Sequence, residues 1–306
     1  MVTALVGYTG FVGSNIYARG KFDAVYNSKN IEEAYGTNPD LLIYAGLRAE
    51  KYLANNQPEK DMELIIQAEN NIEKINPRKL VLISTIDVFK IPKDVDENSA
   101  IDTNNLHAYG YNRYQLELWV RQKFSDALII RLPGLFGENI KKNFIYDFIE
   151  IIPFMLNKAK FEELVEKDID LKNYYQLQQN GFYKVTVSDG EKKLLKDKFR
   201  TLGFSALNFT DSRSVYQFYN LKRLWTDIQT ALDAGITMWH PATEPVSVAE
   251  LYRYITGNEF INELNGVPAD YNYKTIYAEV FGGKGGYIST KVEVMNEISE
   301  FIRQHM

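Results

Sequence analysis

Short apolar runs alternate with longer amphipathic stretches over residues 1–135 of the chain. Five of the apolar runs predict β-strands: Val2–Val6, Ala24–Asn27, Leu41–Tyr44, Leu80–Ser84 and Ala127–Arg131. Two of the stretches between them, Pro58–Ile75 and Ala108–Phe124, predict helices. Short strands joined by helices build right-handed βαβ units, and the resulting parallel sheet is covered on both faces. We therefore expect an α/β fold with a doubly wound parallel sheet.

The regular alternation of strand-like and helix-like segments becomes less clear after Gly137. A charged and amide-rich stretch, residues 158–180, precedes Phe182–Val187, which alternates at period two like a half-exposed strand. The change predicts a second, smaller α+β domain. The expected boundaries are 1–140 for the first domain and mainly 141–306 for the second, with part of 210–240 returning to the first.

The composition narrows the class of partner. Of 306 residues, 45% are apolar and 25% are charged, which is typical of a globular protein. The net charge of −5 leaves no basic excess to track phosphates, so nucleic acid is not expected as a partner. The chain has no cysteine, and its three histidines are scattered, so we expect neither disulfides nor a metal site.

The apolar run Phe144–Leu156 is interrupted by charged residues and by Pro153, and it falls short of the roughly 20 residues that span a bilayer. A strand that begins at Val2 leaves no room for a signal peptide. No membrane partner is therefore expected, and the predicted location is cytoplasmic.

A glycine-punctuated turn follows the first predicted strand. Gly7, Gly10 and Gly13 recur every third residue, and a helical stretch begins among them. Glycine is needed where a backbone turns tightly, approaches a diphosphate closely or lets a helix pack on a strand. The helix N-terminus also offers N–H groups to an anion. The spacing predicts a dinucleotide site, with an ordinary strand-to-helix turn as the alternative.

Four segments, in chain order, resemble the extended short-chain dehydrogenase/reductase family, above all its nucleotide-sugar epimerases, dehydratases and reductases. They are Gly7–Gly13, Leu82–Phe89, Tyr109–Arg113 and Arg131–Gly137. The resemblance is firm over residues 1–140 and patchy beyond, and residues 157–210 match nothing in the family's pattern. It implies a Rossmann sheet that binds NAD(P) and a second domain that binds the substrate.

In that family a tyrosine four residues before a lysine exchanges a proton with the sugar while hydride passes to or from the nicotinamide. The resemblance puts Tyr109 in the tyrosine position, with a buried packing residue as the alternative, and Arg113 in the lysine position. Arginine keeps the positive charge but is longer, planar and forked. Either Arg113 supports the same chemistry with altered geometry, or the protein holds the cofactor without turnover.

Thr85 stands where the family has a serine or threonine that binds the reacting oxygen. Asp87 stands where the 4,6-dehydratase branch has a glutamate, but Ile86 replaces the neighbouring aspartate. Dehydration needs both an acid and a base, so the resemblance favours epimerisation or reduction. Asp87 itself is either a substrate-facing carboxylate or a loop residue.

The segment after the second predicted strand indicates the cofactor. It contains Asn27, Ser28 and Lys29 and no carboxylate before Glu32. Small polar and basic residues suit the 2′-phosphate of NADP, whereas an acidic residue would bind the ribose of NAD. NADP is therefore predicted, with NAD as the alternative. The other residues expected at the cofactor are Gly7, Thr9, Gly10, Phe11, Val12, Gly13, Ala45, Gly46, Ser84, Tyr109, Arg113 and Pro133, and those expected at the substrate are Arg48 and Asn143.

The resemblance and the residues together predict an NAD(P)-dependent oxidoreductase or epimerase for a nucleotide-linked sugar. Tyr109 would move the proton, Thr85 would hold the reacting oxygen, and Arg113 would support the tyrosine and the ribose. The alternative from another class is a cofactor-binding sensor or interaction protein of the same fold that has abandoned catalysis. Apolar helices around Tyr109 are also a candidate face for a homodimer.

Overall fold

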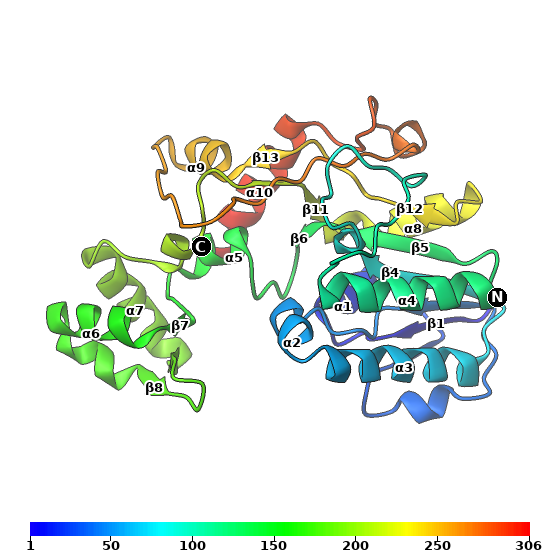
Figure 1. Cartoon of the computed structure of the whole chain (residues 1–306), viewed down its shortest axis with the longest axis horizontal. Helices are drawn as coiled ribbons and strands as arrows, with labels where there is room; N and C mark the ends of the chain where they lie inside the picture. The colour runs from blue at the N-terminus through cyan, green and yellow to red at the C-terminus, as the bar shows by residue number, and fades with distance from the viewer. The chain divides into compact units, whose positions relative to one another are not determined.

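Two units make up the chain in the computed structural model, which describes residues 1–306. Unit 1 contains Met1–Ile140, Val215–Val246 and Ala269–Glu297, and unit 2 contains Lys141–Ser214, Ser247–Pro268 and Ile298–Met306. The chain thus leaves unit 1 after Ile140 and returns to it twice. Figure 1 labels the α-helices and many of the strands of both units.

A six-stranded sheet forms the centre of unit 1. Its strands are β1 (Thr3–Val6), β2 (Ala24–Tyr26), β3 (Leu41–Tyr44), β4 (Lys79–Thr85), β5 (Leu128–Leu132) and β12 (Met238–Trp239). The order is β12-β5-β4-β3-β1-β2, and every neighbouring pair is parallel. All five predicted strands are confirmed to within two residues, and so is the α/β class. The two-residue strand β12 is too short to have a recognisable apolar pattern.

Helices cover both faces of this sheet because its strands are apolar on both sides. Ala4 and Val6 of β1 pack in the cluster that contains helices α3 (Pro58–Ile75) and α4 (Ala108–Lys123). Leu5 packs in the opposite cluster, with helices α1 (Phe11–Tyr17) and α8 (Leu224–Asp233). Each fully buried Leu, Ile or Val contributes about 1.5–3 kcal/mol to such a core. The layers of Figure 1 follow from this two-sided burial.

The strand order reverses at β1, whose neighbours are β2 and β3. In open α/β sheets, ligands bind outside the carboxyl ends of the strands at such a switch point. The residues just beyond those ends are Gly7 after β1 and Ala45 after β3. The topology therefore brings the predicted glycine turn to the place where this fold binds ligands.

Unit 2 has a small core of its own. Its three-stranded antiparallel sheet has the order β7-β9-β8, formed by β7 (Met155–Leu156), β8 (Tyr175–Leu177) and β9 (Tyr183–Val185). Strand β9 confirms the strand predicted over Phe182–Val187. Apolar side chains of helices α6 (Lys158–Lys167) and α7 (Asp189–Thr201) pack in one cluster with those of β7, β8 and β9.

The remaining elements are short apart from one helix. They are η1 (Ile31–Ala34), α2 (Lys51–Asn56), η2 (Ile86–Val88), β6 (Gly134–Phe136), α5 (Phe144–Glu150), η3 (Ile169–Asn173), η4 (Ala206–Phe209), β10 (Val215–Tyr216), β11 (Phe218–Asn220), η5 (Leu221–Arg223), β13 (Val246–Ser247), α9 (Val248–Thr256), η6 (Ala278–Phe281) and α10 (Lys291–His305). None of the helices combines the length and the apolar character that crossing a membrane requires.

Candidate cofactor and active site

Two glycines of the turn sit where a side chain has no room. Gly7 has φ +91°, and a Cβ built there would lie 2.3 Å from the carbonyl oxygen of Ala45. A Cβ on Gly13 would lie 2.1 Å from the Gly7 carbonyl oxygen, so α1 starts directly against the end of β1. Positive φ and close backbone approach both require glycine.

Gly10 differs from its two neighbours, because a Cβ there would meet only the Gly7 carbonyl oxygen, at 3.3 Å. It is exposed, and it caps α1 with no side-chain hydrogen bond. A Cβ at this position would crowd the Gly7 carbonyl oxygen slightly and would otherwise project from the exposed side of the turn. Absence of that Cβ lets a diphosphate approach the backbone, so the residues present fit a dinucleotide. Thr9 is exposed beside it, and Phe11 and Val12 are half-buried at the start of α1.

In the turn after β2, one of the residues predicted to contact the cofactor stabilises the turn, and the other two are exposed. The Asn27 side chain accepts the Lys29 N–H at 2.8 Å and so stabilises the turn itself. Ser28 and Lys29 are exposed. These two side chains are available to an anion beyond β2, whereas the Asn27 amide oxygen is engaged in the backbone turn.

Tyr109 is placed by the start of α4. The His107 ring caps this helix by accepting the Gly110 N–H at 3.0 Å, and the Tyr109 N–H donates to the Asn55 side chain at 3.0 Å. A Cβ on Gly110 would lie 2.1 Å from the Asp87 carbonyl oxygen, so the first turn of α4 packs tightly on η2. Glycine after Tyr109 thus sets how close the helix comes to the end of β4.

The structure brings Tyr109, Thr85 and Arg113 together. Tyr109 is 7% exposed, and its phenol interacts with the side chains of Thr85 and Arg113. Burial raises the pKa of the Tyr109 phenol, Arg113 opposes the rise, and the Asp87 carboxylate adds to it. The phenol is therefore protonated at neutral pH in the free protein.

Arg113 forms a buried ion pair that the sequence did not indicate. Its Nη1 donates to Asp61 of α3 at 2.5 Å, and both side chains are 4% exposed. Its Nη2 donates to the Arg48 carbonyl at 2.7 Å. The guanidinium lies over the Tyr109 ring, with Cζ 3.9 Å from the ring centroid. Two nitrogens of Arg113 therefore donate hydrogen bonds to the protein, and its guanidinium group contacts the Tyr109 ring.

Asp87 belongs to a second ion pair near the phenol. Its Oδ2 lies 3.0 Å from Lys51 Nζ, and its Oδ1 accepts the Tyr271 hydroxyl at 2.7 Å. The Asp87 N–H donates to the Thr85 hydroxyl oxygen at 3.2 Å. Since its carboxylate has these partners and is 17% exposed, Asp87 is more than a solvated loop residue.

Ser84 points to a buried polar cluster. Its hydroxyl donates to Glu117 at 2.6 Å, and Glu117 also accepts from Arg131, with Nη2 at 2.6 Å. Arg131 Nη1 lies 3.3 Å from His240 Nε2. Because the Ser84 hydroxyl is engaged inside the protein, only its backbone is available to a cofactor.

The other predicted residues lie in different surroundings. Gly46 is exposed and Ala45 half-buried just after β3, where Arg48 is exposed and offers its carbonyl to Arg113. Pro133 separates β5 from β6 and is half-buried. Asn143 belongs to unit 2, where its side chain caps α5 by accepting the Ile145 N–H at 3.0 Å. The structure thus gathers the unit 1 residues at the carboxyl ends of the strands and leaves Asn143 in the other unit.

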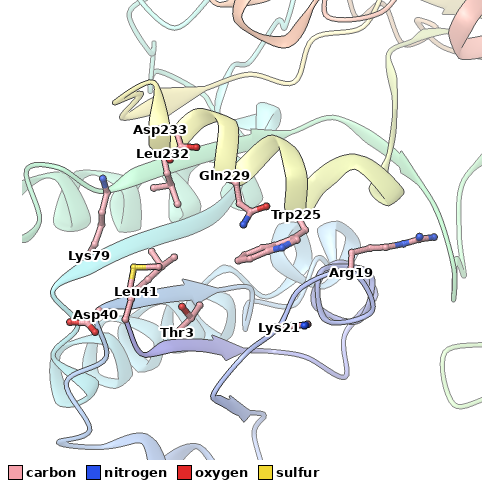
Figure 2. Close-up of a pocket in the computed structure, with 11 residues that line it drawn as sticks. Thr3, Arg19, Lys21, Asp40, Leu41, Lys79, Trp225, Gln229, Leu232 and Asp233 are labelled. Atoms are coloured by element: carbon pink, nitrogen blue, oxygen red, sulfur yellow. The ribbon is translucent and has the colours of Figure 1, made fainter.

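A hollow of about 590 Å³ lies at the opposite edge of the same sheet. Its wall includes Thr3, Leu41 and Lys79, the first residues of β1, β3 and β4. Figure 2 shows Trp225, from α8, among the residues that line the hollow. Since ligands of this fold bind at the carboxyl ends, we place the candidate site at Tyr109 rather than in this hollow.

Sequence reasoning missed several residues around Tyr109. One signal was available for Asp61, which precedes Ile65 and Ala68 at helical spacing and thus falls on the apolar face of α3. Glu117 likewise continues the four-residue spacing of Tyr109 and Arg113 along α4. Lys51 and Tyr271 had no local signal, because they reach Asp87 from other segments.

No protein-family model matches the sequence, and no curated protein matches it either. Among solved structures, dTDP-4-dehydrorhamnose reductase from Yersinia enterocolitica has a TM-score of 0.63 at 12% identity, with 100% of each chain covered. The enzyme of the same name from Bacillus anthracis, in complex with NADP, has a TM-score of 0.62 at 14% identity, with 100% of this chain and 99% of that chain covered.

UDP-glucose 4-epimerase from Thermotoga maritima, with UDP-glucose, has a TM-score of 0.61 at 13% identity, with 99% of each chain covered. These three are extended short-chain dehydrogenases/reductases. At such identities the likeness is one of fold. The doubly wound sheet expected for the first domain is thereby confirmed in unit 1, and the likeness in fold extends over 99–100% of the chain.

Proposed function

We propose that the chain is an NAD(P)-dependent oxidoreductase or epimerase that acts on a nucleotide-linked sugar. One observation carries the proposal: a buried phenol, Tyr109, lies beside the Thr85 hydroxyl and the Arg113 guanidinium in the same unit as the glycine turn. A phenol with a neighbouring hydroxyl and cation suits general acid–base work on a sugar oxygen. Structural neighbours that are named as enzymes of nucleotide-linked sugars, dTDP-4-dehydrorhamnose reductase and UDP-glucose 4-epimerase, support the same substrate class.

In this proposal the chain's residues divide the work. The turn at Gly7, Gly10 and Gly13 receives the diphosphate of the cofactor. When bound, the nicotinamide supplies or accepts hydride. Thr85 donates a hydrogen bond to the reacting oxygen, and Tyr109 exchanges the proton with it. Arg113 orients the phenol by contact with its ring.

NADP is the proposed cofactor and NAD the alternative. The exposed side chains of Ser28 and Lys29 stand where the adenosine ribose is expected, and a serine hydroxyl and an ammonium both suit a 2′-phosphate. One structural neighbour is in complex with NADP. Lys29→Glu is expected to weaken NADP binding and to spare NAD binding, as measured by quenching of protein fluorescence with each dinucleotide.

The test uses purified protein, each dinucleotide and a panel of nucleotide sugars. We expect stereospecific transfer of deuterium between the cofactor and a sugar carbon. Tyr109→Phe should lower turnover by about 10²–10⁴-fold, because it removes the proton carrier, and should weaken dinucleotide binding far less. Leu118→Ala on the exposed side of α4 is the control. Absence of dinucleotide binding by the unchanged protein would overturn the proposal.

The second candidate is a cofactor-binding sensor or interaction protein that does not turn over sugars. The observation that favours it is the engagement of Arg113 with Asp61 and the Arg48 carbonyl, because those nitrogens donate to the protein rather than to a ribose. This candidate predicts dinucleotide binding without deuterium transfer to any sugar and no effect of Tyr109→Phe.

Under the first candidate function, unit 2 is proposed to bind the nucleotide of the sugar, with Asn143 contributing.

A further inference from the structure

The hollow at the amino edge of the central sheet has no part in the proposed reaction. Its volume is about 590 Å³, within the range of roughly 300–1,000 Å³ that is usual for pockets that bind small molecules. All the residues of its wall belong to unit 1. Thr3 in this wall is four residues before Gly7 along β1, which is about 13 Å at ~3.3 Å per residue. A ligand in the hollow would therefore leave the glycine turn free.

Trp225 gives the hollow an aromatic wall that is held in place by its neighbours. Phe22 packs against the indole in a T-shaped arrangement, with ring centroids 4.9 Å apart. A Cβ on Gly20 would lie 2.5 Å from Phe22 Cε2 and 3.0 Å from Trp225 Cε2, so the backbone fits closely around these two rings. The indole is half-buried and lines the hollow. A fixed indole suits a flat ligand ring, because nucleobases stack on aromatic side chains.

The side of the hollow that contains Trp225 also carries two cations. In Figure 2, Arg19 and Lys21 lie on this side, and Lys79 and Asp233 lie on the other. Arg19 and Lys21 are exposed, and their side chains make no hydrogen bond or ion pair within the protein. They do not cap α1 either, since backbone N–H groups donate to its last carbonyls. Both side chains are therefore available to an anion.

The carboxylates near the hollow do not compensate these two cations. Both oxygens of Asp40 have other partners, Arg78 Nη1 at 3.2 Å and the Val2 N–H at 2.7 Å. Asp23 accepts the Thr3 N–H at 2.8 Å and forms no ion pair. The surroundings of Trp225 are therefore positively charged on a chain whose net charge is −5. A phosphate monoester, with about two negative charges at neutral pH, complements them.

Thr3 adds a polar group that has no partner in the protein. The residue is 7% exposed and lines the hollow. Its N–H donates to Asp23, but its hydroxyl makes no hydrogen bond within the protein. Buried hydroxyls are usually hydrogen-bonded. A polar group of a ligand in the hollow would supply the partner that this hydroxyl lacks.

We propose that this hollow is a second ligand site and that it takes a nucleoside monophosphate. The base contacts the Trp225 indole, the phosphate binds Arg19 and Lys21, and a polar group of the nucleoside bonds the Thr3 hydroxyl. The ring and the phosphate use different parts of the wall, so the whole nucleotide binds more tightly than either part alone. This site goes beyond the proposed function and does not depend on it.

The first measurement observes Trp225 directly. The chain has three tryptophans, so protein labelled with 5-fluorotryptophan gives three fluorine-19 signals, and that of Trp225 is identified by its loss in Trp225→Phe. We expect AMP, GMP, CMP or UMP to move this signal in a saturable way, with the fully buried Trp239 as the internal reference. Adenosine and inorganic phosphate should bind at least about tenfold more weakly than AMP. No movement with any of the four nucleotides up to about 10 mM would overturn the inference. Equal affinity for inorganic phosphate would mean a general anion site and would also overturn it.

Charge removal then tests the phosphate contacts. The double variant Arg19→Gln, Lys21→Gln should weaken nucleotide binding at Trp225 by about tenfold, because it removes both cations. Lys29→Gln is the matched control, since Lys21 and Lys29 are both exposed and lie just before and just after β2. All three side chains are exposed, so these variants should fold. Unchanged binding in the double variant, or an equal loss in Lys29→Gln, would contradict the proposed site.

This inference and the proposed function fail separately. If Trp225 responds to the nucleotide but no sugar exchanges deuterium with a dinucleotide, the second site stands and the proposed function is wrong. If deuterium is exchanged but Trp225 does not respond to any nucleotide, the proposed function stands and the second site is wrong.

Discussion

The ion pairs at the two edges of the central sheet differ in how far they are exposed to solvent. At the carboxyl edge, Arg113 and Asp61 form an ion pair in which both side chains are 4% exposed. At the amino edge, Arg78 and Asp40 form a pair at 3.2 Å with side chains that are 80% and 32% exposed. Water screens the second pair and hardly reaches the first. The contribution of a salt bridge to the stability of this protein therefore depends on how deeply the pair is buried.

The carboxyl edge is also the more tightly packed of the two. Gly7, Gly13 and Gly110 each bring backbone within a distance that no Cβ would allow. The amino edge instead contains the hollow at Thr3, Leu41 and Trp225. Substitutions at the carboxyl edge should therefore cost stability or function, and comparable substitutions at the amino edge should be tolerated.

The largest expected effect is at Glu117. Glu117 accepts hydrogen bonds from Nε and Nη2 of Arg131. Glu117→Gln therefore leaves the Arg131 guanidinium as a buried charge without an opposite charge beside it. Removing one partner of such a pair costs about 3–5 kcal/mol. Urea denaturation should show a fall of that size in the free energy of unfolding. A fall below about 1 kcal/mol would mean that water reaches Arg131.

Gly13→Ala should have the next largest effect. The new Cβ would lie 2.1 Å from the Gly7 carbonyl oxygen, so helix and strand must move apart at a cost of about 1–3 kcal/mol. Dinucleotide affinity should fall as well. Gly190→Ala in α7 is the control, because nothing lies within 4 Å of a Cβ there, and it should be neutral or stabilising. Equal stability losses for the two variants would remove the contrast between tight and open positions.

Acid should destabilise unit 1 through His240. Its Nδ1 lies 3.4 Å from the Lys274 carbonyl and its Nε2 faces Arg131, so the ring donates at one nitrogen and accepts at the other. Burial, aided by the Arg131 charge, lowers the pKa of His240 from 6.5 to about 3.

The unfolded chain therefore binds a proton at His240 that the folded chain does not between pH 6.5 and about 3. This group makes the free energy of unfolding decrease as the pH falls through that window, by up to about 1.4 kcal/mol per pH unit. His240→Gln should flatten the decrease in denaturation curves recorded across the window. An unchanged slope in a folded variant would assign the acid sensitivity to other groups.

The smallest expected effect is at Arg78. Arg78→Gln removes the exposed amino-edge pair with Asp40 and should change the free energy of unfolding by no more than about 1 kcal/mol. Added salt should narrow the difference further, since the pair is open to solvent. Thermal denaturation at low and high salt provides the measurement, and a loss as large as that of Glu117→Gln would break the comparison between the two edges.

Local sequence was sufficient for much of unit 1. The strands around Leu5, Ile43 and Leu82 were predictable because they are apolar on both faces and bounded by turns. The juxtaposition of Tyr109, Thr85 and Arg113 was expected from the family resemblance, and the structure brings these side chains together. The two-residue strand β12 and the return of Ala269–Glu297 to unit 1 had no comparable local pattern.

The sequence by itself determined the periodic features of this protein: the strand-forming runs, the helix that presents Tyr109 and Arg113 on one face, and the glycines of the turn. Only the tertiary structure decided that Asp61 pairs with Arg113, that Tyr271 donates a hydrogen bond to Asp87, and that the Ser84 hydroxyl donates to the buried Glu117. The physical reason is the separation along the chain over which each interaction acts. Backbone periodicity and steric fit at glycine act between near neighbours in the chain, whereas burial and charge compensation depend on which distant segments exclude water from the same place.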